Sequence, residues 1–268
     1  MALPIQLVST DFDGTLFAEF ENPPVPQSLQ AIIGSLQARG VRWVINTGRD
    51  LSSLMETLGR AHLSIHPDYL VIVEREIYQR EGSRYVELEE WNNHCTRSHQ
   101  DLFARVRPDV QRLMDWINER FVATLYEDPY SPFCLIAESN HDADSILTFL
   151  EDYARSIPHL SVVRNDVYAR FSHDAFNKGT ALAEIARVTG IDRGQIVAAG
   201  DHINDLPMLR TEHARWLIAP ANAVDAVKES VLQQDGYVSH QPYGHGVARG
   251  LEFVLETSGT DQAGSKSV

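Results

Sequence analysis

Short apolar runs alternate with segments of helical periodicity in the first part of the chain. Apolar residues gather at 5–9, 41–45 and 69–73, and each run is short and bounded by polar residues, which predicts three buried strands. Between them, apolar residues at helical spacing predict helices near 29–36 and 51–58. This alternation is typical of a parallel sheet with helices on its faces.

The pattern changes after Val73. A hairpin is predicted around 77–86, where Glu81-Gly82-Ser83 lies between two short apolar pairs. The segment that follows predicts a helix, two strands, a second helix and two further strands, at 110–117, 121–126, 133–137, 146–153, 160–163 and 167–171. Paired strands with two helices indicate an α+β module.

The alternating pattern returns at Asn177. The predicted elements are a helix, a strand, a helix, a strand and two helices, at 178–190, 196–199, 206–209, 216–218, 223–232 and 247–255. We therefore expect an α/β core with a Rossmann-like parallel sheet, formed by 1–78 and 174–256 and interrupted by an inserted α+β domain at 79–173. The segment 257–268, rich in Gly and Ser, is expected to be a disordered tail.

Composition and charge narrow the range of partners. The 268 residues include 23 Lys and Arg against 37 Asp and Glu, and the formal net charge of -14 would repel nucleic acid from most of the surface. A small anionic substrate is compatible with this charge, because backbone amides, one lysine and a divalent cation can reverse the field inside a cleft. No apolar stretch approaches the ~20 residues of a membrane span, so we expect no membrane partner.

The cysteine content gives an expectation about location. The chain has two cysteines, Cys95 and Cys134, which are too few for a disulfide framework and are consistent with a reducing compartment. A single bridge between them stays open at this stage. We expect a cytoplasmic protein that is a monomer or a weak homodimer.

Two carboxylates lie where the first predicted strand ends. Asp11 and Asp13 are two residues apart, so on an extended segment both side chains point into one crevice. Like charges this close need a cation or a shared proton. A calcium loop of the EF-hand type is excluded, because its sixth and twelfth positions would be Leu16 and Asn22, where Gly and Glu are required. Magnesium, held by a few carboxylates, waters and a substrate phosphate, fits better.

His94, Cys95 and His99 form another group of metal-capable residues. Structural zinc sites combine four ligands in paired spacings, and this group has no paired ligand spacing. We therefore interpret these three side chains as surface or core residues.

Four polar clusters resemble the ordered motifs of the haloacid dehalogenase-like phosphatases. The matching segments are Asp11-Phe12-Asp13-Gly14-Thr15, Thr47-Gly48-Arg49, Lys178-Gly179 and Gly200-Asp201-His202-Ile203-Asn204-Asp205. The place and size of the inserted domain resemble the type IIB cap of the Cof-like and sucrose-phosphatase-like subgroup. The chain departs from the family at Glu74-Arg75-Glu76, where relatives commonly have an Asn-Gly turn.

The resemblance implies catalytic and metal-binding roles for the acidic residues. Asp11 would attack phosphorus to form an aspartyl-phosphate, and Asp13 would serve as general acid and then as general base. Magnesium would be held by the carboxylates of Asp11 and Asp201 and by the backbone carbonyl of Asp13, with Asp205 nearby.

The resemblance also implies a set of groups that bind the phosphoryl oxygens. These are the Thr47 hydroxyl, the Gly48 amide and the Lys178 ammonium, with Asn204 orienting Lys178 or the phosphate.

Two arginines are candidates for substrate contact. Arg49 follows the phosphate-binding segment, and a structural ion pair is an equal interpretation of this residue. Arg170, in the inserted domain, is the other candidate.

The expected function is therefore a magnesium-dependent phosphatase acting on a small phosphorylated metabolite, with a sugar phosphate as the first substrate class. The same core residues would also serve a phosphosugar mutase or another phosphotransferase. A non-catalytic sensor of a phosphorylated ligand is the alternative from a different class. A receiver-type signalling domain is disfavoured, because it has about half this length and its phosphoacceptor lies on a later strand.

Overall fold

The computed structural model describes residues 3–264 of the chain, with side chains described as far as Thr257. The chain divides into two compact units. The core unit contains the residues up to Leu88 and those from Lys178 onward, and the inserted unit is Glu89–Asn177. A discontinuous core interrupted by a second unit is the arrangement that the two changes of sequence pattern suggest.

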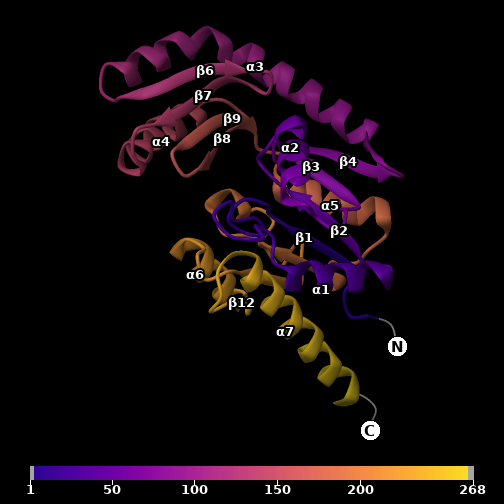
Figure 1. The fold of residues 1–268 in the computed structure, drawn as a ribbon. Coiled ribbons are helices and arrows are strands. Elements are labelled where there is room, and N and C mark those ends of the chain that lie inside the picture. The colour runs from indigo at the N-terminus through magenta and orange to yellow at the C-terminus, as the bar shows by residue number, and fades with distance from the viewer. Residues whose placement is uncertain (1–2, 265–268) are drawn as a thin grey trace. The chain divides into compact units, whose positions relative to one another are not determined.

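The core unit is built on an eight-stranded sheet with the strand order β12-β11-β10-β1-β2-β3-β4-β5 (Figure 1). All neighbouring pairs from β12 to β3 are parallel, and the pairs β3-β4 and β4-β5 are antiparallel. The strands are β1 (Leu7–Thr10), β2 (Arg42–Asn46), β3 (Tyr69–Ile72), β4 (Glu76–Glu81), β5 (Arg84–Glu87), β10 (Ile196–Ala199), β11 (Trp216–Ala219) and β12 (Tyr237–Val238). The expected α/β fold with a mainly parallel sheet is confirmed.

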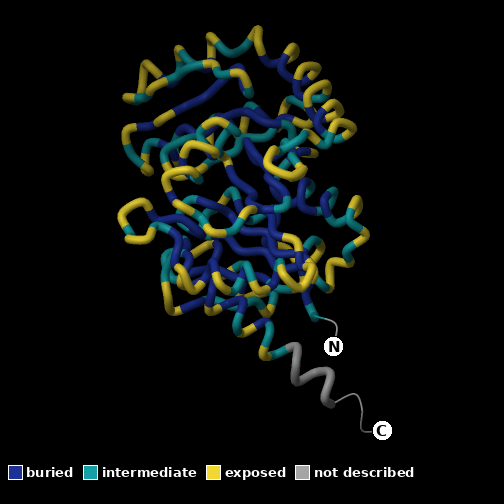
Figure 2. The backbone as a smooth tube through the Cα atoms, turned by 45° about the vertical axis from the view of Figure 1, so that its right-hand side comes forward, coloured by how far each residue is buried: buried dark blue, intermediate teal, exposed yellow. Residues whose placement is uncertain are grey.

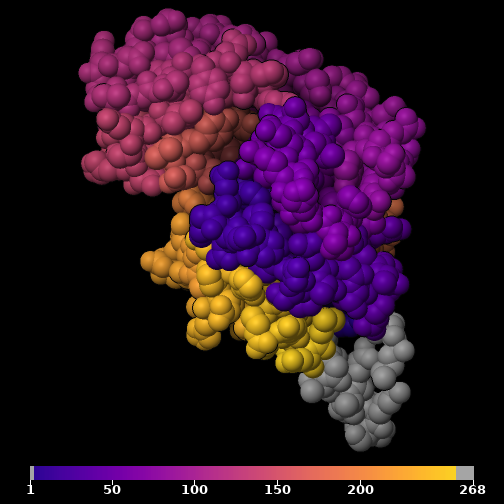
Figure 3. Space-filling model, viewed as in Figure 1, coloured from indigo at the N-terminus to yellow at the C-terminus, as the bar shows by residue number. Residues whose placement is uncertain are grey.

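The central strands of the core sheet are largely buried, and the dark blue segments of Figure 2 mark the buried backbone. Every residue of β1, β3 and β10 is buried, which is expected where helices cover both faces of a parallel sheet. The covering helices are α1 (Gln27–Ala38), α2 (Leu51–Ala61), α5 (Lys178–Thr189), α6 (Asp225–Gln233) and α7 (Tyr243–Gly264). Segments from the two ends of the chain meet here, because α1 packs against α7 (Figure 3).

The hairpin of β4 and β5 belongs to the core sheet, not to the inserted unit. Ile72 at the end of β3 pairs with Glu76 at the start of β4, so the sheet continues across a tight turn. The expected boundary at residue 78 therefore falls inside β4, and the two units divide after Leu88. The sequence pattern misplaced the hairpin because half-exposed strands look the same whichever sheet they extend.

The inserted unit is a four-stranded antiparallel sheet packed on two helices. Its strand order is β6-β7-β9-β8, and its elements are α3 (Glu89–Asn118), β6 (Ala123–Asp128), β7 (Ser131–Ala137), α4 (Asn140–Ala154), β8 (Leu160–Asn165) and β9 (Tyr168–His173). A separate apolar cluster fills the space between helices and sheet, with Leu102, Phe133, Ile146 and Phe171 at its centre. The unit therefore has its own core, as an α+β domain does.

Three helix expectations need correction. The helix expected at 110–117 is the end of α3, which has 30 residues and contains Pro108 inside it. The segment 206–209 forms turns after a short 3-10 helix, Ile203–Asp205, instead of a longer helix. The helix α7 continues to Gly264, so the tail expected from residue 257 does not begin there, and 265–268 lie outside the described residues.

No helix among residues 3–264 combines the length and the apolar character that crossing a bilayer requires.

Candidate active site

The predicted motifs of the core unit meet at the carboxyl ends of its parallel strands. Asp11 follows β1, which lies between β2 and β10 in the sheet. Thr47 follows β2, and Gly200 and Asp201 follow β10. Lys178 is the first residue of α5, and Asn46 Nδ2 donates to its carbonyl oxygen at 2.9 Å. Ligand sites of open α/β sheets lie at this edge.

Lys178 is the cationic centre of the site. Its Nζ donates to Asp11 Oδ1 and to Asp205 Oδ1, each at 2.6 Å. The side chains of Lys178 and Asp205 are fully buried, and that of Asp11 is 9% exposed. Burial disfavours charge on Lys178, but Asp11 and Asp205 outweigh burial and raise its pKa. Lys178 is therefore a fixed ammonium ion beside Asp11, the nucleophile predicted from the sequence.

Asp11, Asp201 and Asp205 form a cluster that can hold a metal ion, since one carboxylate oxygen of each lies within 4.8 Å of the others. Burial, and then the charge of Asp205, raise the pKa of Asp11 well above its usual value. The same two causes raise the pKa of Asp201 to about 7. Three acids beside one lysine leave excess negative charge, and a divalent cation would relieve it.

Local hydrogen bonds fix the orientation of these acids. Thr15 Oγ1 donates to Asp201 Oδ1 at 2.6 Å. Asp205 Oδ2 accepts from the backbone N–H groups of Asp201 and His202, at 2.8 and 3.0 Å. Asp201 and Asp205 thus each use one carboxylate oxygen in these hydrogen bonds, and the other oxygen of Asp205 accepts from Lys178.

Two glycines allow the acidic loops to approach closely. Gly14 has φ +75°, and a methyl group added there would lie 2.5 Å from Asp201 Oδ2. A methyl group on Gly200 would lie 2.5 Å from the Cβ atom of Asp205. Only glycine fits at both positions, so these residues set how near the acids can come to one another.

Asp13 is held by an arginine. Arg49 Nε and Nη2 donate to its two carboxylate oxygens at 2.7 Å each, and Arg49 Nη1 donates to Ser53 Oγ at 3.1 Å and Thr57 Oγ1 at 2.9 Å on α2. The hydrogen bond to Asp13 raises the pKa of Arg49. Of the two interpretations of Arg49, the structure contains the ion pair.

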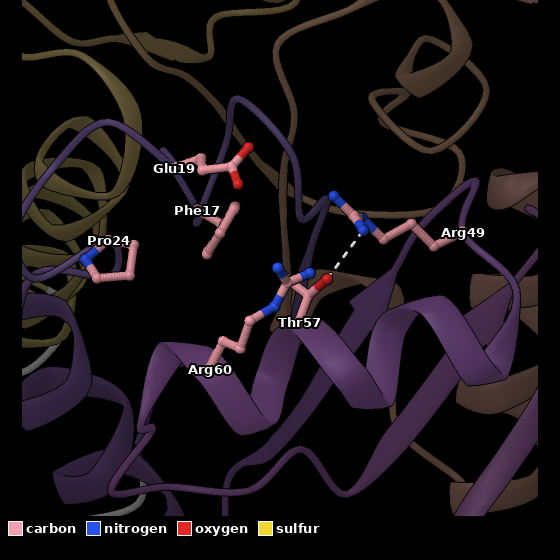
Figure 4. A pocket seen from close by; sticks show the side chains of 6 residues that line it. All are labelled: Phe17, Glu19, Pro24, Arg49, Thr57 and Arg60. Atoms are coloured by element: carbon pink, nitrogen blue, oxygen red, sulfur yellow. Dashed lines mark hydrogen bonds between the residues drawn. The ribbon is translucent and has the colours of Figure 1, made fainter.

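A pocket of about 390 Å³ lies beside this pair (Figure 4) and is lined by Phe17, Glu19, Pro24, Arg49, Thr57 and Arg60. The hydrogen bond from Arg49 to Thr57 forms part of its wall. Arg60 lies on α2, as Thr57 does, and forms an exposed ion pair with Glu56 at 3.4 Å.

Two of the residues expected to bind phosphate, Thr47 and Asn204, make side-chain hydrogen bonds within the core unit. Thr47 is buried, and its hydroxyl accepts from the Arg49 N–H at 3.2 Å. Asn204 Nδ2 donates to Glu74 Oε1 at 2.8 Å, a partner that was not anticipated. Sequence reasoning marked Glu74 as a departure from the family turn but gave it no role in the site.

The remaining candidate, Arg170, lies on β9 of the inserted unit and is buried. Its contact with substrate stays a prediction.

His99 is a structural residue of the inserted unit, as expected. Its Nε2 accepts from the His173 N–H at 3.1 Å, which leaves the proton on Nδ1, and Nδ1 lies 2.8 Å from the Cys95 carbonyl oxygen. Both ring nitrogens are thus engaged. Cys95 and Cys134 are free thiols, so the bridge left open from the sequence is not formed.

A second cluster of metal-capable side chains lies in the inserted unit and consists of His159, His173 and Asp174. The two imidazole rings are stacked with an interplanar angle of 9°. Nitrogen lone pairs lie in the ring planes, so those of stacked rings run parallel instead of converging on one ion. The arrangement fits a histidine cluster beside Asp174, whose Oδ1 lies 3.1 and 3.3 Å from the two Nδ1 atoms.

The chain is similar in sequence to two protein families and to several phosphatases. The family of haloacid dehalogenase-like hydrolases matches residues 96–251, and the sucrose-6F-phosphate phosphohydrolase family matches residues 4–115. YxeH of Bacillus subtilis strain 168 is 24% identical over 277 residues, which cover 93% of this chain and 98% of that protein. The phosphoglycolate phosphatase of Methanosarcina acetivorans is 26% identical over 157 residues, 59% of this chain and 65% of that protein.

Solved structures show the same fold. The sucrose-phosphatase of Synechocystis sp. PCC6803, solved in complex with sucrose and phosphate, superposes with a TM-score of 0.68 at 18% identity and covers 93% of this chain and 98% of that chain. The first family match covers more than half of the chain, and its Lys178 and Asp201 to Asp205 segments form the site described above. The chain therefore belongs to the haloacid dehalogenase-like hydrolases and, within them, to the Cof-like and sucrose-phosphatase-like phosphatases.

Proposed function

We propose that this phosphatase requires Mg²⁺ and hydrolyses a small phosphorylated metabolite, a sugar phosphate first, through a phosphoryl group carried on Asp11. The observation that supports this most strongly is the contact between Asp11 and the buried ammonium of Lys178 at 2.6 Å. This contact supports the proposal because a carboxylate nucleophile needs a fixed cation beside it, where the phosphoryl oxygens carry negative charge.

The donor set suits magnesium. Asp11, Asp201 and Asp205 offer carboxylate oxygens within 4.8 Å of one another, and oxygen ligands are those that Mg²⁺ prefers. Burial, and then the charge of Asp205, raise the pKa values of Asp11 and Asp201, so negative charge on these two buried acids is unfavourable without a cation beside them. Bound there, Mg²⁺ would supply the charge that lets Asp11 meet a phosphate dianion.

The chain's own residues account for two displacements. In the first, Asp11 forms a bond to phosphorus, the bond from phosphorus to the leaving oxygen breaks, and Asp13 gives that oxygen a proton. In the second, Asp13 takes a proton from water as the water oxygen bonds to phosphorus, and the Asp11 carboxylate leaves. Thr47, the Gly48 N–H and Lys178 would bind the phosphoryl oxygens in both steps.

The substrate class rests on the relatives and on charge. Sucrose-phosphatase is among the structural neighbours, and its complex with sucrose and phosphate supports a phosphorylated sugar as the first substrate to test. The net charge of -14 disfavours polyanions. We further propose that the inserted unit is a cap that selects the leaving group, with Arg170 as one contact.

The test is hydrolysis of a panel of phosphate esters by the purified chain, with Mg²⁺ and with EDTA. The proposal predicts release of inorganic phosphate from at least one sugar phosphate, dependent on Mg²⁺. Labelled phosphate that appears on a second sugar instead of in water would identify a mutase. Binding of esters without any turnover would identify a sensor, and either outcome would overturn the proposal.

A further inference from the structure

Glu74 is a buried acidic residue beside the predicted phosphate-binding loop. Its exposed fraction is 6%, and its Oε1 accepts a hydrogen bond of 2.8 Å from Asn204 Nδ2. A methyl group added to Gly48 would lie 3.4 Å from the same oxygen, so the carboxylate packs against the Gly48 backbone. Glu74 thus contacts two residues to which phosphate binding is assigned.

Glu74 provides the bond that orients the Asn204 amide. The other polar atom of that side chain, Oδ1, is buried and has no hydrogen-bond partner among the described residues. A buried amide with one partner depends on that partner for its orientation. Removing the acceptor at Glu74 would therefore free Asn204 to rotate.

The backbone of the turn keeps the Glu74 carboxylate at this place. The Glu74 N–H donates to the Thr47 carbonyl and the Val73 N–H to the Arg49 carbonyl, each at 2.9 Å. Val73 and Glu74 have φ values of 43° and 66°. Such values are costly for residues other than glycine, and most of all for a β-branched one, and they persist where the surroundings enforce them. The strained turn thus joins β3 to the loop after β2.

The negative charge of Glu74 also acts on Lys178 at the proposed catalytic centre. Burial opposes the positive charge of Lys178, and Asp11, Asp205 and Glu74 together outweigh it. A carboxylate that lies this close to the loop also repels a phosphate dianion, because charges in a partly buried site are weakly screened.

We infer that Glu74 is a positioning residue of the phosphate subsite: it holds Asn204 in place, and its charge limits the affinity of the subsite for a phosphate dianion. The inference rests on the proposed function, since it assumes that the loop at Thr47 and Gly48 binds phosphate. The subsite then releases inorganic phosphate readily after each turnover.

Two substitutions separate the hydrogen bond from the charge. Glu74→Gln keeps an acceptor for Asn204 and removes the charge, whereas Glu74→Ala removes both. Glu81→Gln is the matched control, because it removes one exposed acidic charge from the β4-β5 hairpin without touching the loop. Thermal unfolding of each variant verifies that it folds.

Binding of inorganic phosphate is measured by calorimetry in the presence of Mg²⁺, and hydrolysis of the best ester is measured in parallel. We expect Glu74→Gln to bind phosphate ~10-fold more tightly than the parent chain, the effect of about 1.4 kcal/mol of lost repulsion, and Glu81→Gln to bind like the parent. We expect Glu74→Ala to lose ~10-fold in kcat through misplacement of Asn204, while Glu74→Gln keeps kcat within about threefold.

Equal phosphate affinity of Glu74→Gln and the parent chain would overturn the inference, as would the absence of phosphate binding in both. A parent chain that binds phosphate but hydrolyses no ester would instead overturn the proposed function alone. Equal kcat values for Glu74→Ala and Glu74→Gln would overturn the positioning role.

Discussion

Arg49 binds the carboxylate of Asp13 through two hydrogen bonds of 2.7 Å, and two side chains of α2, Ser53 and Thr57, bind the same guanidinium. The planar guanidinium matches a carboxylate in this geometry, which lysine cannot reproduce. Helix α2 therefore anchors Arg49, and Arg49 in turn positions Asp13, the residue proposed as general acid and base. The pair is partly exposed, at 28% for Arg49 and 41% for Asp13.

Arg49→Lys should lower kcat by ~10- to 100-fold, because Asp13 loses its fixed position while Asp11, the proposed nucleophile, is unaffected. Steady-state kinetics with the best ester from the panel provide the measurement. Arg60→Lys is the control, since Arg60 lines the same pocket and forms an exposed ion pair with Glu56, and it should stay within about twofold of the parent. An unaffected kcat in Arg49→Lys would show that the pair has no part in catalysis.

Lys178→Met should both inactivate and destabilise the protein. The substitution leaves Asp11 and Asp205 buried beside one another without their ammonium partner. Removing one partner of a buried ion pair typically lowers the free energy of unfolding by roughly 3–5 kcal/mol. Because Lys178 is also proposed to bind the phosphoryl oxygens, its removal should cost a further factor of ~10²–10³ in rate. Urea denaturation and ester hydrolysis measure the two effects.

The control for that prediction is Lys228→Met, which removes a partly exposed lysine 3.8 Å from the exposed Asp225. Its unfolding free energy should stay within about 0.5 kcal/mol of the parent. Equal stability of both methionine variants would contradict the role given to the buried ion pairs.

The metal-free protein should lose stability as the pH rises from about 4 to above 7. The folded-state pKa of Asp11 is raised, and burial and Asp205 raise that of Asp201 to about 7. The folded state therefore holds these protons more strongly than the unfolded chain, whose aspartates titrate near ~3.9, so ionisation in that window favours unfolding.

Added Mg²⁺ should reverse this loss. The increase in Tm that Mg²⁺ causes should therefore be on the order of several degrees larger at pH 8 than at pH 5. Thermal unfolding with Mg²⁺ or EDTA at both pH values tests this. Asp201→Asn should lose most of the gain. A gain of the same size at both pH values, or its persistence in Asp201→Asn, would argue against a metal at these acids.

Much of the core and its motifs could be predicted from the sequence, because a buried parallel strand has a continuous apolar run and ends at a polar turn. Asp11, Thr47 and Asp201 each follow such a run, and parallel strands carry all three residues to one edge. The sequence did not show which sheet the β4-β5 hairpin extends, since pairing between strands is a long-range property.

The interactions of individual side chains were harder to anticipate. Arg49 had two equal interpretations because both use the same donors, and only the geometry distinguishes them. Glu74 attracted notice as a departure, but its contact with Asn204 joins residues 130 positions apart in the chain. The helix expected at 110–117 is part of a longer one, because α3 begins at Glu89 and continues through Pro108.

The central claim is that Asp11 carries the phosphoryl group. The most direct measurement is mass spectrometry of the Asp11 peptide after acid quenching of the chain during turnover of its best ester with Mg²⁺. The account predicts one added phosphoryl group on Asp11 in the parent chain, and neither the modification nor hydrolysis in Asp11→Asn. Undiminished hydrolysis by Asp11→Asn, or a phosphoryl group found on another residue, would contradict it.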